Sequence, residues 1–165
     1  FPETLKPLFA KSCQYGSSIY SCAPVPIQYA TQELLENTEI CKTYVERTKT
    51  LYSHVIKEII PFLDNTKLKH PGIESSWYVY LDFKSYKEGL NKIGVQDSIQ
   101  LSHYLMVNYH ILTVAAQHFG DDSLSLRFSL VDFEIDLEKE DIKDVNTVNM
   151  KEGFQHLVRF LDSLE

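Results

Sequence analysis

Residues 97–137 read DSIQLSHYLMVNYHILTVAAQHFGDDSLSLRFSLVDFEIDL, and they decide which fold is expected. Within them, residues 123–130 alternate strictly between polar and apolar side chains, which predicts a strand with one buried face. The apolar positions are Leu124, Leu126, Phe128 and Leu130, and the polar positions are Ser123, Ser125, Arg127 and Ser129. The polar face has one guanidinium among small hydroxyls, with room beside it for a carboxylate or phosphate. An ordinary solvated strand face is the alternative.

The part that precedes this strand has two interpretations. Asp97 and Gln100 have the spacing of a capping box, which predicts the start of a helix. An apolar stripe from Leu101 to Phe119 fits one unbroken helix, whereas residues 109–114 (YHILTV) also fit a strand. Periodicity does not decide between the two.

After Leu130 the alternation changes phase, which predicts a bend or bulge followed by more strand as far as Leu137. The acids of that second part share its outer face and are interpreted as solvated. They are Asp132, Glu134 and Asp136. A last amphipathic helix is expected to begin at a cap formed by Asn149 and Glu152.

Upstream, the longest periodic segment predicts a helix from about residue 28 to residue 60, which Pro61 should end. The turn-rich sequence of residues 15–26 predicts a loop before it. Alternation and aromatic content predict a strand over residues 77–83, followed by a short helix over Lys84–Ile93 that Gly94 caps.

Three cysteines, Cys13, Cys22 and Cys41, make an odd set without a C-x-x-C spacing. Such a set favours reduced thiols and a cytoplasmic location, although one Cys13–Cys22 bridge with a spare thiol is an alternative. Cys41 lies on the apolar stripe of the long helix, which predicts a buried, inert thiol.

The bulk properties limit the class of protein. With 165 residues and 44% apolar content, the chain is expected to form one globular domain, or one domain with an appendage. The net charge is −7, and residues 121–144 carry nine acidic and three basic side chains. An acidic chain without a basic stripe argues against nucleic acid as a binding partner. No apolar run is long enough to span a membrane. No histidine pattern predicts a metal site.

Four stretches together resemble the C-terminal part of class I/II pyridoxal-phosphate (PLP) aminotransferases, the fold-type I superfamily. Their order and separations match that part of the family over nearly the whole chain. They are SCAPVPIQYATQELLE (21–36), CKTYVERTKTLYSHVIKEI (41–59), PGIESSWYVYLDF (71–83) and DSIQLSHYLMVNYHILTVAAQHFGDDSLSLRFSL (97–130).

The resemblance implies an α+β small domain over residues 31–165, with a three-stranded, mainly antiparallel sheet (about 77–83, 110–114 and 124–131) covered by helices. It implies a long N-terminal interdomain helix and a break near Val107. Residues 1–30 would be the tail of a missing large domain.

The family's carboxylate-binding Arg corresponds to Arg127. The resemblance therefore implies an intact parent enzyme, expected to be a homodimer, that uses PLP to transfer an amino group between an amino acid and a 2-oxo acid. In such an enzyme a lysine anchors the cofactor and shuttles the proton.

Two departures from the family stand out. The family's Pro-Gly is Ala115-Ala116 in this chain. The family's cofactor lysine motif lies upstream of every matched stretch, and Lys11 lacks the motif's neighbours. Because that motif and the large cofactor-binding domain are absent, we expect a C-terminal fragment without catalytic, cofactor-binding or metal residues of its own. The alternatives are a secreted helical-bundle signalling protein, or a domain that only binds or dimerises.

Overall fold

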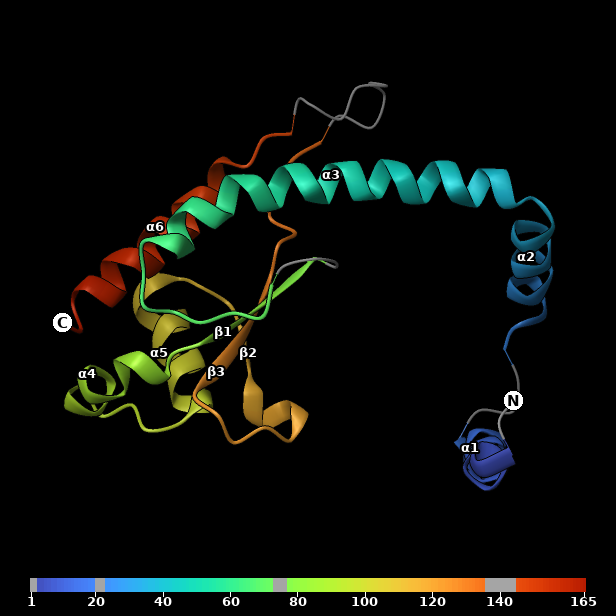
Figure 1. Cartoon of the computed structure of the whole chain (residues 1–165), viewed down its shortest axis with the longest axis horizontal. Coiled ribbons are helices and arrows are strands. Elements are labelled where there is room, and N and C mark those ends of the chain that lie inside the picture. Colours follow the sequence, from blue (N-terminus) through green and yellow to red (C-terminus); the bar gives the residue numbers. More distant parts are fainter. Residues whose placement is uncertain (1–2, 20–22, 73–76, 136–144) are drawn as a thin grey trace. The chain divides into compact units, whose positions relative to one another are not determined.

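The computed structural model describes residues 3–19, 23–72, 77–135 and 145–165, and it divides the chain into two compact units (Figure 1). The units are Phe1–Glu46 and Arg47–Glu165. The assignment of residues 1–30 to a large-domain tail and of residues 31–165 to a small domain remains a prediction.

The first unit consists of helices. They are η1 (Glu3–Leu5), α1 (Lys6–Ile19), α2 (Val25–Glu36) and the first residues of α3 (Thr38–Asp64). The predicted loop is wrong for residues 15–19, which continue α1, and for Val25 and Pro26, which begin α2. Ser17 and Ser18 stay compatible with a helix because both hydroxyls donate to the Gln14 carbonyl at 2.9 Å. Neither α1 nor α2 has a buried residue.

The single helix predicted for residues 28–60 is two helices that separate at Asn37. Asn37 leaves the helical region with φ −103° and ψ 61°. Its side-chain amide donates to the carbonyl and the carboxylate of Glu33, at 3.2 and 2.6 Å. Such side-chain bonds compete with the helical ladder, which explains a break that the apolar spacing does not reveal.

Pro61 does not end the long helix, because α3 continues to Asp64. A proline inside a helix costs about 3 kcal/mol. Ile59 and Leu63 on either side are almost fully buried, at 0% and 2% exposure, and each buried aliphatic side chain contributes about 1.5–3 kcal/mol. The free energy gained from tertiary packing therefore outweighs the cost of the proline in the helix.

Cys41 is partly exposed rather than buried, and its Sγ lies 3.3 Å from the Leu34 carbonyl. The stripe that it shares has a buried core only farther along α3, at Val55, Ile59 and Leu63. Cys13 and Cys41 are both free thiols.

The second unit contains the predicted three-stranded sheet. Its strands are β1 (Tyr78–Asp82), β2 (Val114–Ala115) and β3 (Ser125–Ser129), in the order β1-β3-β2 with both pairings antiparallel. The α+β fold class is thereby confirmed. The inner face of the sheet belongs to one core with side chains of α3, α5 (Ser98–Tyr109) and α6 (Val148–Asp162).

Figure 1 shows α6 beside the C-terminal part of α3. Two pairs connect them, because Phe62 and Phe154 have ring centroids 6.5 Å apart and Lys151 forms a salt bridge with Glu58.

The predicted break between residues 98 and 119 is confirmed. Asp97 Oδ1 accepts the Gln100 N–H at 2.8 Å, so the capping residue was predicted correctly. α5 ends at Tyr109, and His110 follows in the left-handed region with φ 58°. A bundle that needs one unbroken helix over this range is not formed. The following strand is shorter than predicted, because it holds only Val114 and Ala115.

The remaining elements agree in part with the prediction from the sequence. The short helix is η2 (Lys84–Tyr86) followed by α4 (Lys87–Lys92), and Gly94 has the expected positive φ of 82°. The predicted cap at Asn149 is wrong, because Asn149 lies inside α6, whose N-cap residue is Thr147. The Val148 N–H at the start of the helix donates to Asn146 Oδ1 at 3.1 Å.

The segment after β3 differs from the strand that was predicted for it. β3 ends at Ser129, and the Leu130 N–H still donates to the Trp77 carbonyl at 2.7 Å. In residues 131–135 only Glu134 makes a bridge, with Asn146. Val131, expected on an apolar face, is 55% exposed. Asp136 and Leu137 lie outside the described residues.

Candidate functional site

Arg127 occupies the middle of the central strand. It pairs with Tyr80 on β1 and with Val114 on β2. Its neighbours Leu126 and Phe128 are buried in the core, whereas Arg127 is half-buried on the opposite face, as the alternation predicted. The backbone at Arg127 is therefore fixed by strand pairing on both sides.

Two aromatic rings hold the guanidinium. Arg127 Cζ lies 4.1 Å from the centroid of the Tyr78 ring and 4.9 Å from that of Phe119. Both distances are within the range of a cation–π interaction. The space that the serine face was expected to leave beside Arg127 is therefore taken up in part by rings.

One hydrogen-bond donor of Arg127 is not used. Its Nε is buried and has no hydrogen-bond partner within the described residues. A buried donor without a partner costs about 1–3 kcal/mol. Because the rings stack on the guanidinium while a donor stays unpaired, the arrangement suits an acceptor supplied from outside, and a carboxylate accepts two parallel N–H bonds from such a fork.

The serines near Arg127 belong to a separate hydrogen-bonded group centred on Asp121. Tyr80 donates its hydroxyl to Asp121 Oδ2 at 2.6 Å, and the Ser123 N–H donates to Oδ1 at 2.9 Å. Ser123 Oγ lies 2.8 Å from Asp121 Oδ2 and from Ser125 Oγ. This group fixes the turn before β3 and orients Tyr80 opposite Arg127.

This group shifts the pKa of two of its members. The Tyr80 hydroxyl, followed by the backbone and side chain of Ser123, lowers the pKa of Asp121 below its usual value. Burial, followed by the hydrogen bond to Asp121, raises the pKa of Tyr80.

We expect the Asp121 group to make folding sensitive to acid. A carboxyl with a lowered folded-state pKa stabilises the fold above its unfolded pKa of about 3.9, and this contribution is lost as the pH falls through the folded value. Tyr80→Phe removes the main cause of the lowered pKa, so its melting temperature should fall less between pH 7 and pH 3 than that of the wild type. Thermal unfolding at both pH values measures this, and an unchanged difference would contradict it.

Ala115 and Ala116 replace the Pro-Gly of the resembled family without an unusual backbone. Ala115 has φ −68° and ψ 143°, which is a conformation that proline also adopts. Both alanines are buried, and Ala116 begins the short helix η3 (Ala116–Phe119). This turn places Phe119 against the guanidinium.

Sequence reasoning found Arg127 but missed both of its ring partners. Tyr78 could have been found, because it alternates with Tyr80 on the predicted outer face of residues 77–83. Phe119 gave no signal, since its position depends on the turn between β2 and β3.

In the described ranges, no group of three or more His, Cys, Asp or Glu side chains is placed to hold a metal ion. None of the helices in these ranges has the length and apolar character that crossing a bilayer requires. No protein-family model matches the chain, and no curated protein is significantly similar to it in sequence.

Proposed function

We propose that this chain is the C-terminal part of a PLP-dependent aminotransferase and that Arg127 binds the α-carboxylate of the amino acid or 2-oxo acid. The observation that carries the proposal is the guanidinium between Tyr78 and Phe119, with a buried donor left unpaired. The three-stranded sheet with Arg127 on its central strand is consistent with the small domain of that family.

In this proposal no lysine of this chain anchors the cofactor. A lysine that forms a Schiff base needs an environment that favours its neutral form. Three of the lysines are instead paired with carboxylates, in the pairs Lys42–Glu39, Lys67–Glu165 and Lys151–Glu58. Glu165 even raises the pKa of Lys67. In this proposal the cofactor is held by a part of the parent protein outside this chain.

The first unit supports the same proposal. Its helices α1 and α2 have 14 and 12 residues and bury no side chain, although isolated helices of this length are marginal in water. Large apolar side chains remain exposed on them, among them Phe9 (55%), Tyr15 (70%) and Leu35 (71%). A large domain of the parent enzyme would cover them.

The full-length product of the gene tests the proposal directly. We expect it to bind PLP and to transfer the amino group of at least one standard amino acid to 2-oxoglutarate, pyruvate or oxaloacetate. Coupled assays with each acceptor measure the transfer. A full-length protein that neither binds PLP nor transfers an amino group would contradict the proposal and leave a domain that only binds or dimerises.

The isolated 165-residue chain is the matched control. Incubation with PLP and reduction with borohydride should label no lysine stoichiometrically, because none is placed as a cofactor anchor. One fully labelled lysine, resistant to competition by free amines, would show that the active site lies on this chain.

A further inference from the structure

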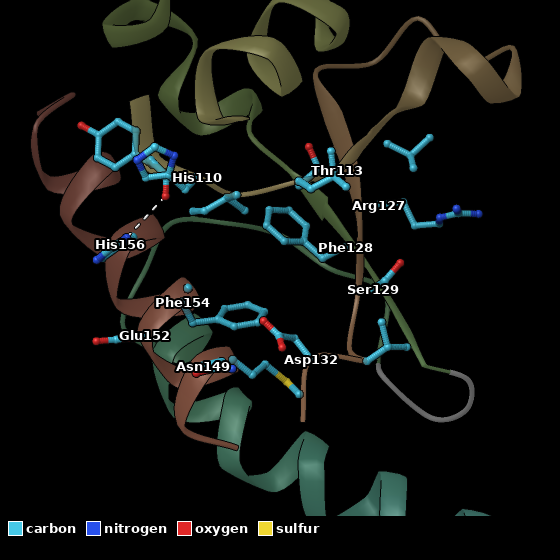
Figure 2. A pocket seen from close by; sticks show the side chains of 17 residues that line it. His110, Thr113, Arg127, Phe128, Ser129, Asp132, Asn149, Glu152, Phe154 and His156 are labelled. Atoms are coloured by element: carbon cyan, nitrogen blue, oxygen red, sulfur yellow. Dashed lines mark hydrogen bonds between the residues drawn. The ribbon is translucent and has the colours of Figure 1, made fainter. Parts of the chain in front are cut away.

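A cavity of about 600 Å³ opens in the second unit, next to the sheet. Strands β2 and β3 pair only at Val114–Arg127 and Ala115–Leu126. Residues 109–114 form one wall of the cavity, and the N-terminal half of α6 forms another (Figure 2). The third wall is formed by Arg127, Phe128, Ser129, Val131 and Asp132. The volume lies within the range of about 300–1,000 Å³ that is typical of sites for small molecules.

The inner wall of the cavity is apolar and aromatic. Phe128, Met150 and Phe154 line it, and each is 5% exposed. The rings of Phe128 and Phe154 have centroids 5.9 Å apart. Gly153 adds no bulk, and a Cβ at this position would meet no atom within 4 Å. The apolar part of a ligand can therefore reach this wall.

A single carboxylate faces this apolar wall. Figure 2 shows Asp132 extending toward the Phe154 ring, whereas Glu152 extends away from it. Asp132 is exposed and makes no hydrogen bond or ion pair with another described residue. The Arg127 guanidinium does not neutralise the Asp132 carboxylate. The guanidinium lies against the rings of Tyr78 and Phe119, and it points away from Phe128 and Phe154 (Figure 2).

Two histidines stand at the opposite end of the cavity. His156 Nδ1 lies 3.4 Å from the Tyr109 carbonyl, which is a weak contact, and His110 is exposed. The side chains of Asn149 and Thr113 are neutral. Asp132 therefore provides the one formal charge that is directed at the aromatic wall in the described part of the cavity.

We propose that this cavity binds a small amphipathic cation, with an aromatic or branched aliphatic group against Phe128 and Phe154 and an ammonium group beside Asp132. Burial of the apolar group supplies the affinity, and the carboxylate selects the charge. Arg127 also lines this cavity, but its side chain extends away from Phe128 and Phe154, so the ammonium group is placed on the side of Asp132. The inference does not depend on the proposed function.

Three ligands of nearly equal size test the charge selection. They are 2-phenylethylamine, 2-phenylethanol and 3-phenylpropionate, titrated into the ¹⁵N-labelled 165-residue chain at low salt. We expect the amine to bind most tightly, and the largest amide shifts should occur at Asp132 and Gly153. Equal affinities for the three ligands, tighter binding of the anion, or no binding of the amine at 10 mM would overturn the proposal.

Paired substitutions locate the site. Asp132→Asn should weaken binding of the amine roughly two- to fivefold and remove its preference over the alcohol. Glu152→Gln removes the same charge from a side chain that points away, so it should change the affinity less than twofold. Equal effects of the two would show that only the overall charge matters.

The cavity is tested separately by filling it. Gly153→Leu should weaken binding of all three ligands at least about tenfold, because the new side chain occupies the open space beside the aromatic wall. Gln155→Leu, on an exposed position of the same helix outside the cavity, should leave the affinities unchanged.

A variant on the surface keeps the test decisive if Gly153→Leu does not fold. Asp132→Lys lies on an exposed segment, and it should reverse the preference from the amine to 3-phenylpropionate. An unchanged preference for the amine in this variant would overturn the proposal.

Discussion

Gly89→Ala is expected to destabilise the second unit, even though alanine is the better helix former. Gly89 lies in α4, and an added Cβ would be 2.3 Å from the Leu164 carbonyl oxygen and 2.8 Å from Leu164 Cβ. Since the obstacle includes backbone, either α4 must move or Leu164, which is 8% exposed, must leave its site. Overpacking of this kind costs about 1–3 kcal/mol, which thermal or urea unfolding would detect.

Gly153→Ala is the matched control, because Gly153 also lies within a helix but has free space beside its Cα. It should stabilise the protein by up to about 1 kcal/mol, as helix propensity predicts. The two substitutions are chemically identical, so their opposite signs separate packing from propensity. A stabilising Gly89→Ala would show that Leu164, just after α6, does not pack against α4.

The parts of the fold that sequence analysis predicted correctly are those where a core fixes the pattern. The alternation of residues 123–130 indicated the central strand because Leu126 and Phe128 must reach the core from every second position. The cap at Asp97 was found because it is formed by residues only three positions apart. Both are local signals that the tertiary structure reinforces.

The errors lie where local and tertiary effects oppose each other or where there is no core. The apolar spacing continues through Asn37, but a side-chain bond to Glu33 ends the helix there. Pro61 was expected to end the helix, but the helix continues through it because the burial of Leu63 stabilises the helical conformation. The residues before α2 are misjudged because no buried residue constrains α1.

The candidate site was predicted only in part, for a related reason. The face of the strand on which Arg127 lies follows from residues 123–130 alone. The ring partners depend on the register between β1 and β3 and on the turn that holds Phe119, and both are set by residues far apart in the chain. The cavity beside the sheet also depends on residues far apart in the chain, because it lies where the short pairing of β2 with β3 ends.

If the proposed function holds, Arg127→Ala in the full-length protein is expected to lower kcat/KM for the amino acid roughly 30- to several-thousand-fold, which corresponds to about 2–5 kcal/mol of transition-state stabilisation. The reason is the loss of a charge-assisted, two-pronged bond to the α-carboxylate in a site where the rings of Tyr78 and Phe119 lie against the guanidinium. Arg127→Lys keeps the charge but loses the planar fork, so its loss should be smaller but still clear.

The decisive comparison uses each amino acid and the matching amine that lacks the carboxylate. Selective loss for the amino acid supports carboxylate binding, because only that substrate has the group that Arg127 binds. Phe119→Leu keeps apolar bulk but removes one π face, so it should show the same selectivity with a smaller effect of about 0.5–1 kcal/mol.

Stability separates this role from a structural one. The Arg127 guanidinium leaves a buried Nε unpaired in the protein alone, and its removal relieves that cost while it forfeits two ring contacts. These effects oppose each other, so the free energy of unfolding should change by no more than about 1 kcal/mol. Equal loss of activity for the amino acid and the amine, together with a large fall in melting temperature, would instead mean that Arg127 holds Tyr78 of β1 and Phe119 of η3 against β3 and binds no substrate.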